Sequence, residues 1–528
     1  MKLFLTLIFL LAGSVFSSSV MSTPPPYKPL EYRIASFHRG RANKELIKRA
    51  HQLGYNGVQF QLEGSVMGGL RGFAERDRKE GYVKLCHSLG MKVTLWIHEL
   101  SDIPGEKDPG YPGPITLENE KLWKSIEDRY ELVLGEIVPD IDGLVLTVVE
   151  TQINAANTDL MLKLVDIIHA KCLKYHKELH VRTFTWHPEE LTQVVAAVKR
   201  MPPDVVVMSK IVPQDWQMRG TMAKEIGAFG ARKQIIEWDI AGEYFLMDTV
   251  ANCFHETIKR QFDYGVSKDM DGVCVRVDRF DQDVLEQPQE VNMWALGMFA
   301  DGKTRSVPDV WNAWATARYG KAASKGVIAA LKPTQFVMEE VLNVGTFSFG
   351  DTRGFPPPNG DKDAFWTNWA NWRWDDAYIP EKHKATAGDF IYTSEVAAAK
   401  MKGLILADKC LAELEKVKGK LTIQDYEILR TRLQSNLAQL ESRSPMMIAY
   451  LKYQRLKRSQ SQTEKDQIKV EIAEQLDTLR KIADRPTPQL REIQYRGKTW
   501  KVGAPLGWQP DKVKQWTDKM EQLANQTK

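Results

Sequence analysis

Residues that can act as acids, bases or sugar ligands recur at one kind of place, at or just after the end of a short apolar run. Glu150 directly follows the run Leu144–Val149, and Lys210 lies near the end of Val205–Ile211. Hydrolysis of a glycosidic bond needs one carboxylic acid to protonate the leaving oxygen and a second carboxylate to activate water or attack the sugar. The set therefore predicts hydrolysis of a polar, ring-shaped substrate. Its further members are Glu63, His98, Glu99, Arg182, Trp186, His187, Asp215, Trp216, Glu237, Asp239, Glu243, Tyr244, Arg276 and Asp278.

These candidates differ in how strongly the sequence supports them. Glu150 is the strongest candidate. It directly follows an unbroken apolar run, and barrel glycosidases often have their acid at the end of such a strand. Glu63 and Asp278 fit a solvated loop or a helix N-cap at least as well. Glu237 and Arg182 have apolar neighbours, so structural ion pairs are an alternative to binding substrate.

Metal and cofactor chemistry have little support in the sequence. His98, Glu99 and His187 do not form the three-ligand spacing of a catalytic zinc site. The five cysteines include no CxxC pair, and we expect them to be buried free thiols or to form one disulfide. We therefore expect no metal and no cofactor.

The elements that must position these residues alternate in type. Eight apolar runs are separated by amphipathic stretches, which predicts a (β/α)8 TIM barrel with its active residues at the carboxyl ends of the strands. A doubly wound open sheet is the rival, but no GxGxxG follows any run. The predicted strands are Tyr32–Phe37, Gly57–Leu62, Lys92–Ile97, Gly143–Val149, His180–Trp186, Val205–Ile211, Gln234–Ile240 and Gly272–Val277, and the stretches include Asn43–Leu53, Glu75–Leu89, Asn119–Leu134, Asp159–His176, Pro188–Arg200 and Val250–Tyr264.

The chain divides into four predicted parts. Residues 1–22 read as a signal peptide, with a charged start, an apolar run and small residues before the cut. Residues 23–320 are the catalytic barrel, 321–393 a Trp-rich loop insert covering the barrel mouth, and 394–528 an all-helical C-terminal domain. The insert's Trp366, Trp369, Trp372 and Trp374 either plug the domain junction or line a sugar cleft. The expected helical segments of the last part are Val396–Leu414, Ile423–Leu440, Met446–Leu456, Thr463–Ala483 and Pro510–Ala524.

Composition limits the partners and the location. The 72 Lys and Arg residues nearly balance 68 Asp and Glu, a net charge of +4, so we expect no nucleic-acid partner. No segment after the leader has 18 uninterrupted apolar residues, so we expect no membrane insertion. Ser14 stands where a lipoprotein box would have its lipidated cysteine, which predicts a periplasmic or secreted protein without a lipid anchor. The expected partner is an oligosaccharide, and a homodimer through the helical C-terminal domain is a further expectation.

Several short motifs resemble the family 67 α-glucuronidases. Lys210–Arg219 is similar to that family's Lys-Asn-Gly-Pro-Met-Asp-Phe-Gln-Val-Arg segment, and Glu237–Tyr244 to its Glu-Leu-Gln-Ile-Thr-Gln-Glu-Tyr. Val181–Phe184 resembles its Trp-Arg-Ala-Phe, and Glu290–Gly297 its last barrel helix. The motifs are scattered over about residues 50 to 400, so the resemblance is that of a distant relative.

The resemblance implies roles for individual residues. Glu150 would be the general acid of an inverting reaction, and Asp215 and Glu243 would orient and deprotonate water. Arg182 and Lys210 would hold the sugar, with Glu237, Trp186 and Trp216 as further binding residues. The family has a Lys four residues before its acid, where this chain has Leu146, so one cation that would bind a glucuronate carboxylate is missing.

The sequence thus predicts a secreted glycoside hydrolase, an inverting, exo-acting α-glycosidase of oligosaccharides, with a uronic acid as a candidate sugar. A non-catalytic carbohydrate-binding barrel is the first alternative. A retaining glycosidase using Glu150 as acid/base and Glu237 as nucleophile is the second.

Overall fold

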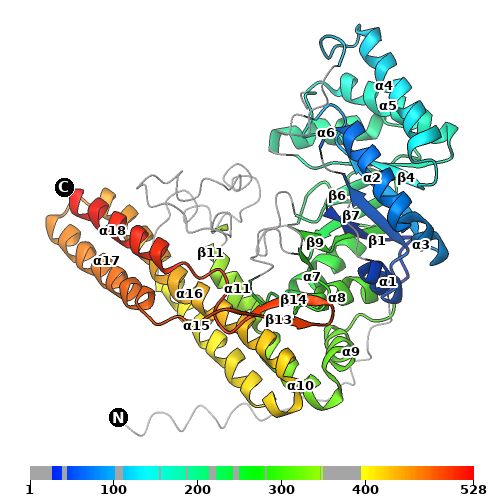
Figure 1. Cartoon of the computed structure of the whole chain (residues 1–528). Coiled ribbons are helices and arrows are strands. Elements are labelled where there is room, and N and C mark those ends of the chain that lie inside the picture. The colour runs from blue at the N-terminus through cyan, green and yellow to red at the C-terminus, as the bar shows by residue number, and fades with distance from the viewer. Residues whose placement is uncertain are drawn as a thin grey trace, which may run out of the picture.

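A closed barrel of eight parallel strands forms the N-terminal part of the protein, on the right in Figure 1. The computed structural model describes residues 27–38, 44–62, 64–101, 111–153, 156–185, 188–212, 222–241, 249–279, 282–344, 347–348 and 394–527. The strands follow one another around the barrel in chain order, and β8 closes it by pairing with β1. They are β1 (Tyr32–Phe37), β2 (Gly57–Gln61), β3 (Lys92–Ile97), β4 (Gly143–Thr147), β5 (Glu178–Arg182), β6 (Val206–Lys210), β7 (Gln234–Asp239) and β8 (Gly272–Arg276). The predicted barrel is confirmed.

Side chains point alternately to the two sides of each strand, and this decides which of them lie inside the barrel. One set of side chains fills the interior, while their neighbours on the same strands face the surrounding helices. Both faces are thus buried, which is why the strands read as continuous apolar runs in the sequence. The interior cluster consists of Tyr32, Ile34, Trp96, Val145, Val206, Met208, Ile235 and Cys274.

Helices follow most of the strands. They are α1 (Lys44–Gln52), α2 (Val66–Glu80), α3 (Tyr82–Ser88), α4 (Glu120–Leu132) with a π-helical turn (Val133–Ile137), α5 (Thr158–Lys174), α6 (Pro188–Arg200), α7 (His255–Val266) and α8 (Glu290–Ala300). The single helix predicted over Glu75–Leu89 is wrong in its bounds. The chain forms two helices, because Gly81 takes a left-handed conformation with φ 69° and caps the end of α2.

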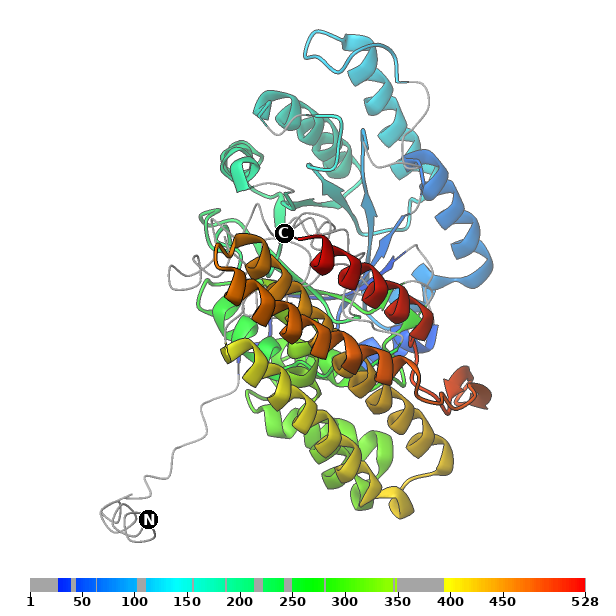
Figure 2. The same ribbon diagram turned by 90° about the vertical axis from the view of Figure 1, so that its left-hand side faces the viewer.

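A helical C-terminal region completes the fold, as predicted. Its helices are α9 (Val307–Tyr319), α10 (Lys321–Leu331), α11 (Thr334–Leu342), α15 (Ser394–Glu415), a 3-10 turn (Lys418–Lys420), α16 (Ile423–Arg458), α17 (Gln462–Ala483) and α18 (Pro510–Gln526). The yellow-to-red helices of this region stand in front of the barrel in Figure 2. Residues 321–342, which we assigned to the loop insert, form α10 and α11 and pack against α15 and α16. No helix among the described residues is long and apolar enough to cross a membrane.

Two features of this region differ from the prediction. Helix α16 runs without a break through Pro445, where two separate segments were expected. A hairpin of β13 (Arg491–Tyr495) and β14 (Lys498–Val502) interrupts the helices and was not predicted. Shorter pairs are β9 (Asp278–Arg279) with β10 (Gln282–Asp283) and β11 (Asn343–Val344) with β12 (Phe347–Ser348). All five cysteines are buried and unpaired, as one of the two expectations had it.

Candidate active site

Glu150 lies just beyond the carboxyl end of β4 in a left-handed backbone conformation. Its φ is 63°, a value that costs a non-glycine residue about 1–3 kcal/mol and that recurs at active sites as well as in turns. Its side chain is 13% exposed, whereas most charged neighbours are nearly inaccessible. The loop after β3 supports this conformation. Ser101 pairs with Thr151, and the Gln152 backbone N–H donates to the Leu100 carbonyl at 2.8 Å.

An ion pair between Arg182 of β5 and Glu237 of β7 lies beneath this position. Arg182 Nε donates to Glu237 Oε2 at 2.7 Å and Nη2 donates to Oε1 at 3.4 Å, with exposed fractions of 2% and 0%. Burial alone would raise the pKa of Glu237, but the charges of Arg182, Arg276 and Lys210 outweigh burial and lower it. Glu237 is thus held as a carboxylate. We gave a structural ion pair as an alternative role for Arg182 and Glu237, and that ion pair is present.

Arg182 also reaches Glu150, so one guanidinium faces both carboxylates. Arg182 Nη1 lies 3.7 Å from Glu150 Oε2, and His98 Nε2 lies 3.5 Å from the same oxygen. His98 is buried, and its ring lies 5.4 Å from that of Trp96. From the sequence, His98 belongs to the set of residues at the strand ends and was weighed as a metal ligand, but its contact with Glu150 was not predicted. The sequence does contain a signal for the position of His98. It lies two residues after Trp96, and side chains two residues apart in an extended chain point to the same side, here into the barrel.

Aromatic rings separate the cations at this end of the barrel. The Arg182 Cζ atom lies 4.4 Å from the Trp96 ring centre and 5.1 Å from that of Phe184. Lys210 Nζ lies 3.7 Å from the Phe184 ring centre, so the Phe184 ring contacts both cations. Arg182 and Lys210 therefore lie on the same aromatic ring, and their reaching one sugar together stays a prediction.

Arg276 of β8 completes a polar layer at the carboxyl ends of the strands. Its Nε lies 3.9 Å from Glu237 Oε1, and its Nη2 donates to Gln61 Oε1 at 3.4 Å. Trp96 donates its indole N–H to Thr147 Oγ1 at 2.7 Å. Polar groups from five or more strands thus converge beside Glu150, the arrangement in which barrel enzymes build their active sites.

Of the other predicted residues, some lie outside the part of the chain that the structure describes and others make structural contacts. Asp215, Glu243, Trp186, Trp216, Glu63, His187 and Tyr244 lie outside the described residues, as do the four tryptophans at 366–374. Glu99 is fully buried in contacts with Arg129, Tyr111 and Tyr130, the last at 2.6 Å. Asp278 accepts the backbone N–H of His38 at 2.5 Å. Both are therefore engaged in structural contacts.

Leu146 occupies the position at which the family 67 α-glucuronidases have a lysine. Its side chain lies in the outer core, whereas Val145 and Thr147 belong to the interior. A lysine at 146 would point toward the helices and not into the barrel mouth. Among the residues that the structure describes, no group of three His, Cys, Asp or Glu side chains is arranged to hold a metal ion.

Comparison with known proteins supports the fold. No family model and no curated protein matches the sequence. A solved enzyme of glycoside hydrolase family 138, described as targeting pectin rhamnogalacturonan II, superimposes with a TM-score of 0.65 over 94% of this chain and 84% of its own, at 11% identity. A family 89 glycoside hydrolase from Clostridium perfringens gives 0.48 over 87% and 55%, at 10% identity. A family 84 enzyme gives 0.45 over 94% and 76%, also at 10% identity.

The first of these likenesses extends beyond the barrel to most of the chain, so this whole architecture occurs in a glycoside hydrolase. None of the three belongs to family 67. The resemblance to that family stays a prediction, and at 11% identity the first likeness shows the fold alone.

Proposed function

We propose that the protein is a glycoside hydrolase and that Glu150 is its general acid. The observation that carries this proposal is the setting of Glu150. A strained, partly exposed carboxylate stands at a strand end, beside a buried layer of ion-paired side chains. The family 138 enzyme with the same architecture supports the same class of reaction. A carboxylic acid so placed can protonate a leaving glycosidic oxygen.

In this proposal the reaction inverts the configuration at the sugar carbon. Asp215 and Glu243 orient and deprotonate a water, while Glu150 protonates the leaving group. Glu237 fits poorly as a nucleophile, because it is fully buried and both of its oxygens accept hydrogen bonds from Arg182. We assign Glu237 the role of holding Arg182, so that it acts on the substrate through that guanidinium. Trp186 and Trp216 are proposed to contact the sugar.

The proposed substrate is an acidic oligosaccharide, cleaved at its end. Arg182, Lys210 and Arg276 bring three cations to the same end of the barrel, and a guanidinium binds a sugar carboxylate well. Lys210 is the cleanest test, because Arg182 also has a structural role. Lys210→Met should lower kcat/KM on uronate-terminated substrates about tenfold or more relative to neutral ones, the loss expected for one charged hydrogen bond. Equal losses on acidic and neutral substrates would contradict the acidic-sugar proposal.

The first experiment is a screen of plant and algal oligosaccharides, followed by proton NMR of the first anomer released. The proposal expects the released sugar to have the opposite configuration to the substrate bond. Retention would support the second alternative, with Glu150 and Glu237 as the catalytic pair. Binding of oligosaccharides without any turnover would support the non-catalytic alternative.

We also propose that residues 1–22 direct the chain out of the cytoplasm and are removed. Expression of the full chain in a Gram-negative host, cell fractionation and N-terminal sequencing of the recovered protein test this. A new N-terminus between residues 17 and 24 in the periplasmic fraction is expected, and an intact Met1 in the cytoplasm would contradict it. The homodimer through the C-terminal region stays a prediction.

A further inference from the structure

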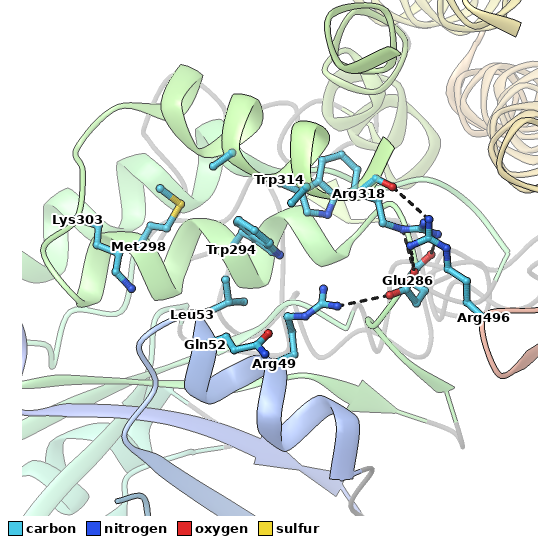
Figure 3. Close-up of a pocket in the computed structure, with 12 residues that line it drawn as sticks. Arg49, Gln52, Leu53, Glu286, Trp294, Met298, Lys303, Trp314, Arg318 and Arg496 are labelled. Atoms are coloured by element: carbon cyan, nitrogen blue, oxygen red, sulfur yellow. Dashed lines mark hydrogen bonds and ion pairs between the residues drawn. The ribbon is translucent and has the colours of Figure 1, made fainter. Parts of the chain in front are cut away.

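A cavity lies on the outer wall of the barrel, and its lining includes no residue of the candidate active site. Helix α1 forms one side, α8 and α9 form another, and the tip of the β13–β14 hairpin closes one end (Figure 3). Its volume is about 360 Å³, within the range of small-molecule sites. The lining residues are Arg49, Gln52, Leu53, Glu286, Trp294, Met298, Lys303, Ala313, Trp314, Ala317, Arg318 and Arg496.

The middle of this cavity is apolar and aromatic. Leu53, Met298, Trp294 and Trp314 line it, and Trp294 is only partly buried. Trp314 is fully buried, and its indole N–H has no hydrogen-bond partner within the described part of the chain. Because this N–H is also inaccessible to water, the Trp314 indole serves as an apolar part of the wall, and the partly buried Trp294 is the ring that a ligand can contact.

One end of the cavity is a cluster of guanidinium groups around Glu286. Arg318 and Arg496 each lie 3.0 Å from its carboxylate, and Arg49 lies 3.6 Å away. Glu286 has φ 67°, so its backbone is strained to hold this position. Arg49 and Arg496 remain 29% and 35% exposed, and a guanidinium carries five donors. They can therefore donate to a ligand without breaking these pairs.

The charge of the lining favours an anion. Lys303 and the three arginines face the cavity together with a single carboxylate, Glu286. Glu290, Asp425 and Asp301 offset part of this charge through ion pairs with Arg49, Arg318 and Lys303, and none of the three lines the cavity. At that end a ligand carboxylate would meet the donors of Arg49 and Arg496 beside the one carboxylate of Glu286.

We propose that this cavity is a second carbohydrate-binding site that takes one uronate residue of an acidic glycan. The apolar face of the sugar ring packs on Trp294, as sugar rings do on indoles. Its carboxylate accepts from Arg49 and Arg496, and its hydroxyls meet Gln52 and Glu286. The choice of a sugar rests on the proposed function, since a hydrolase of acidic glycans gains from holding a long chain at a second point.

The test uses the full chain labelled with ¹⁵N at its indoles, with the Trp294 and Trp314 signals assigned from Trp294→Phe and Trp314→Phe. D-Galacturonate and D-glucuronate are titrated, with D-galactose and D-glucose as matched neutral sugars. We expect saturable shifts of both signals with at least one uronate and about tenfold weaker binding of its neutral counterpart. Trp294→Ala should weaken the binding about tenfold or more, while turnover of a short substrate stays unchanged.

Lys210→Met is the matched background, because it weakens the uronate binding proposed for the active site and leaves this cavity unchanged. The same indole shifts with the uronate are expected in Lys210→Met. The proposal fails if neither indole signal responds up to the solubility limit, if neutral sugars bind equally well, or if Trp294→Ala binds as tightly as the parent. Failure of the proposed function is a different result, namely a protein without turnover on any glycan, and the indole shifts do not depend on it.

Discussion

Replacing Glu237 by Gln should destabilise the protein strongly, because it removes the closer and fully buried one of the two carboxylates that balance the buried charge of Arg182. The two side chains are 0% and 2% exposed, so water cannot take over the role of the lost carboxylate. Removing one partner of a buried pair of this kind costs about 3–5 kcal/mol. A surface carboxylate without such a role, Glu118, supplies the matched control, and Glu118→Gln should change stability by no more than about 0.5 kcal/mol.

Urea unfolding followed by tryptophan fluorescence measures the effect, since the chain contains 15 tryptophans. The charge-free double variant Arg182→Met with Glu237→Gln should be less destabilised than the two single changes added together. A loss below about 1 kcal/mol for Glu237→Gln would refute the reasoning that the pair is buried and unscreened.

The pH dependence of the same variant gives an independent check with a defined sign. The pKa of Glu237 is lowered in the folded protein from its ordinary value of 4.5. The stability that the charged carboxylate contributes is therefore fully present above pH 4.5 and is lost as the pH falls through the folded value. The difference between the parent and Glu237→Gln should shrink only in that acidic range. A difference that instead shrinks as the pH rises from 5 to 8 would contradict the assignment.

Two further predictions concern single side chains. His98→Gln should lower kcat about 10- to 100-fold, as expected for the loss of one contact to a charged group, and should shift the pH–rate profile while KM changes little; an unchanged profile would show that His98 does not act on Glu150. Burial raises the pKa of Glu225 to about 7, so the parent should lose about 3 kcal/mol of stability as the pH rises from 4.5 to 7, a loss that Glu225→Gln should abolish and that urea unfolding across this range would detect.

The barrel could be predicted because its strands are buried on both faces. All eight apolar runs correspond to strands, and the differences at their ends are a few residues. The β13–β14 hairpin could not be found in the same way. Its strands are mostly exposed and carry charged residues, so no apolar run marks them. The Arg496–Gly497 turn, with φ 51° and 73°, was the one local signal available.

The predicted helix boundaries are wrong where tertiary packing outweighs the local conformational preference of the sequence. Pro445 predicts a break, yet it is buried within α16, and packing against α15 and α17 carries the helix through. A single glycine such as Gly81 does not predict the end of a helix. Helix α2 ends there because Gly81 takes a left-handed conformation, which the sequence alone does not show.

The candidate site was predictable as a set of residues but not as a set of contacts. Strand ends and alternation place Arg182, Lys210, Glu237 and Glu150 together. Which carboxylate pairs with which cation depends on positions across the barrel, which a linear sequence does not encode. For the same reason the sequence did not show that Leu146 faces outward or that His98 faces Glu150.

The most direct test of the central claim is the turnover of Glu150→Gln on two matched substrates. One is an unactivated oligosaccharide found in the screen, and the other is the dinitrophenyl glycoside of the same terminal sugar, whose leaving group needs no proton. The proposal predicts a loss of roughly 10²–10⁴ on the oligosaccharide, a far smaller loss on the dinitrophenyl glycoside, and unchanged urea unfolding. More than about a tenth of the parent activity on the oligosaccharide, or equal losses on both substrates, would contradict the assignment of Glu150 as the acid.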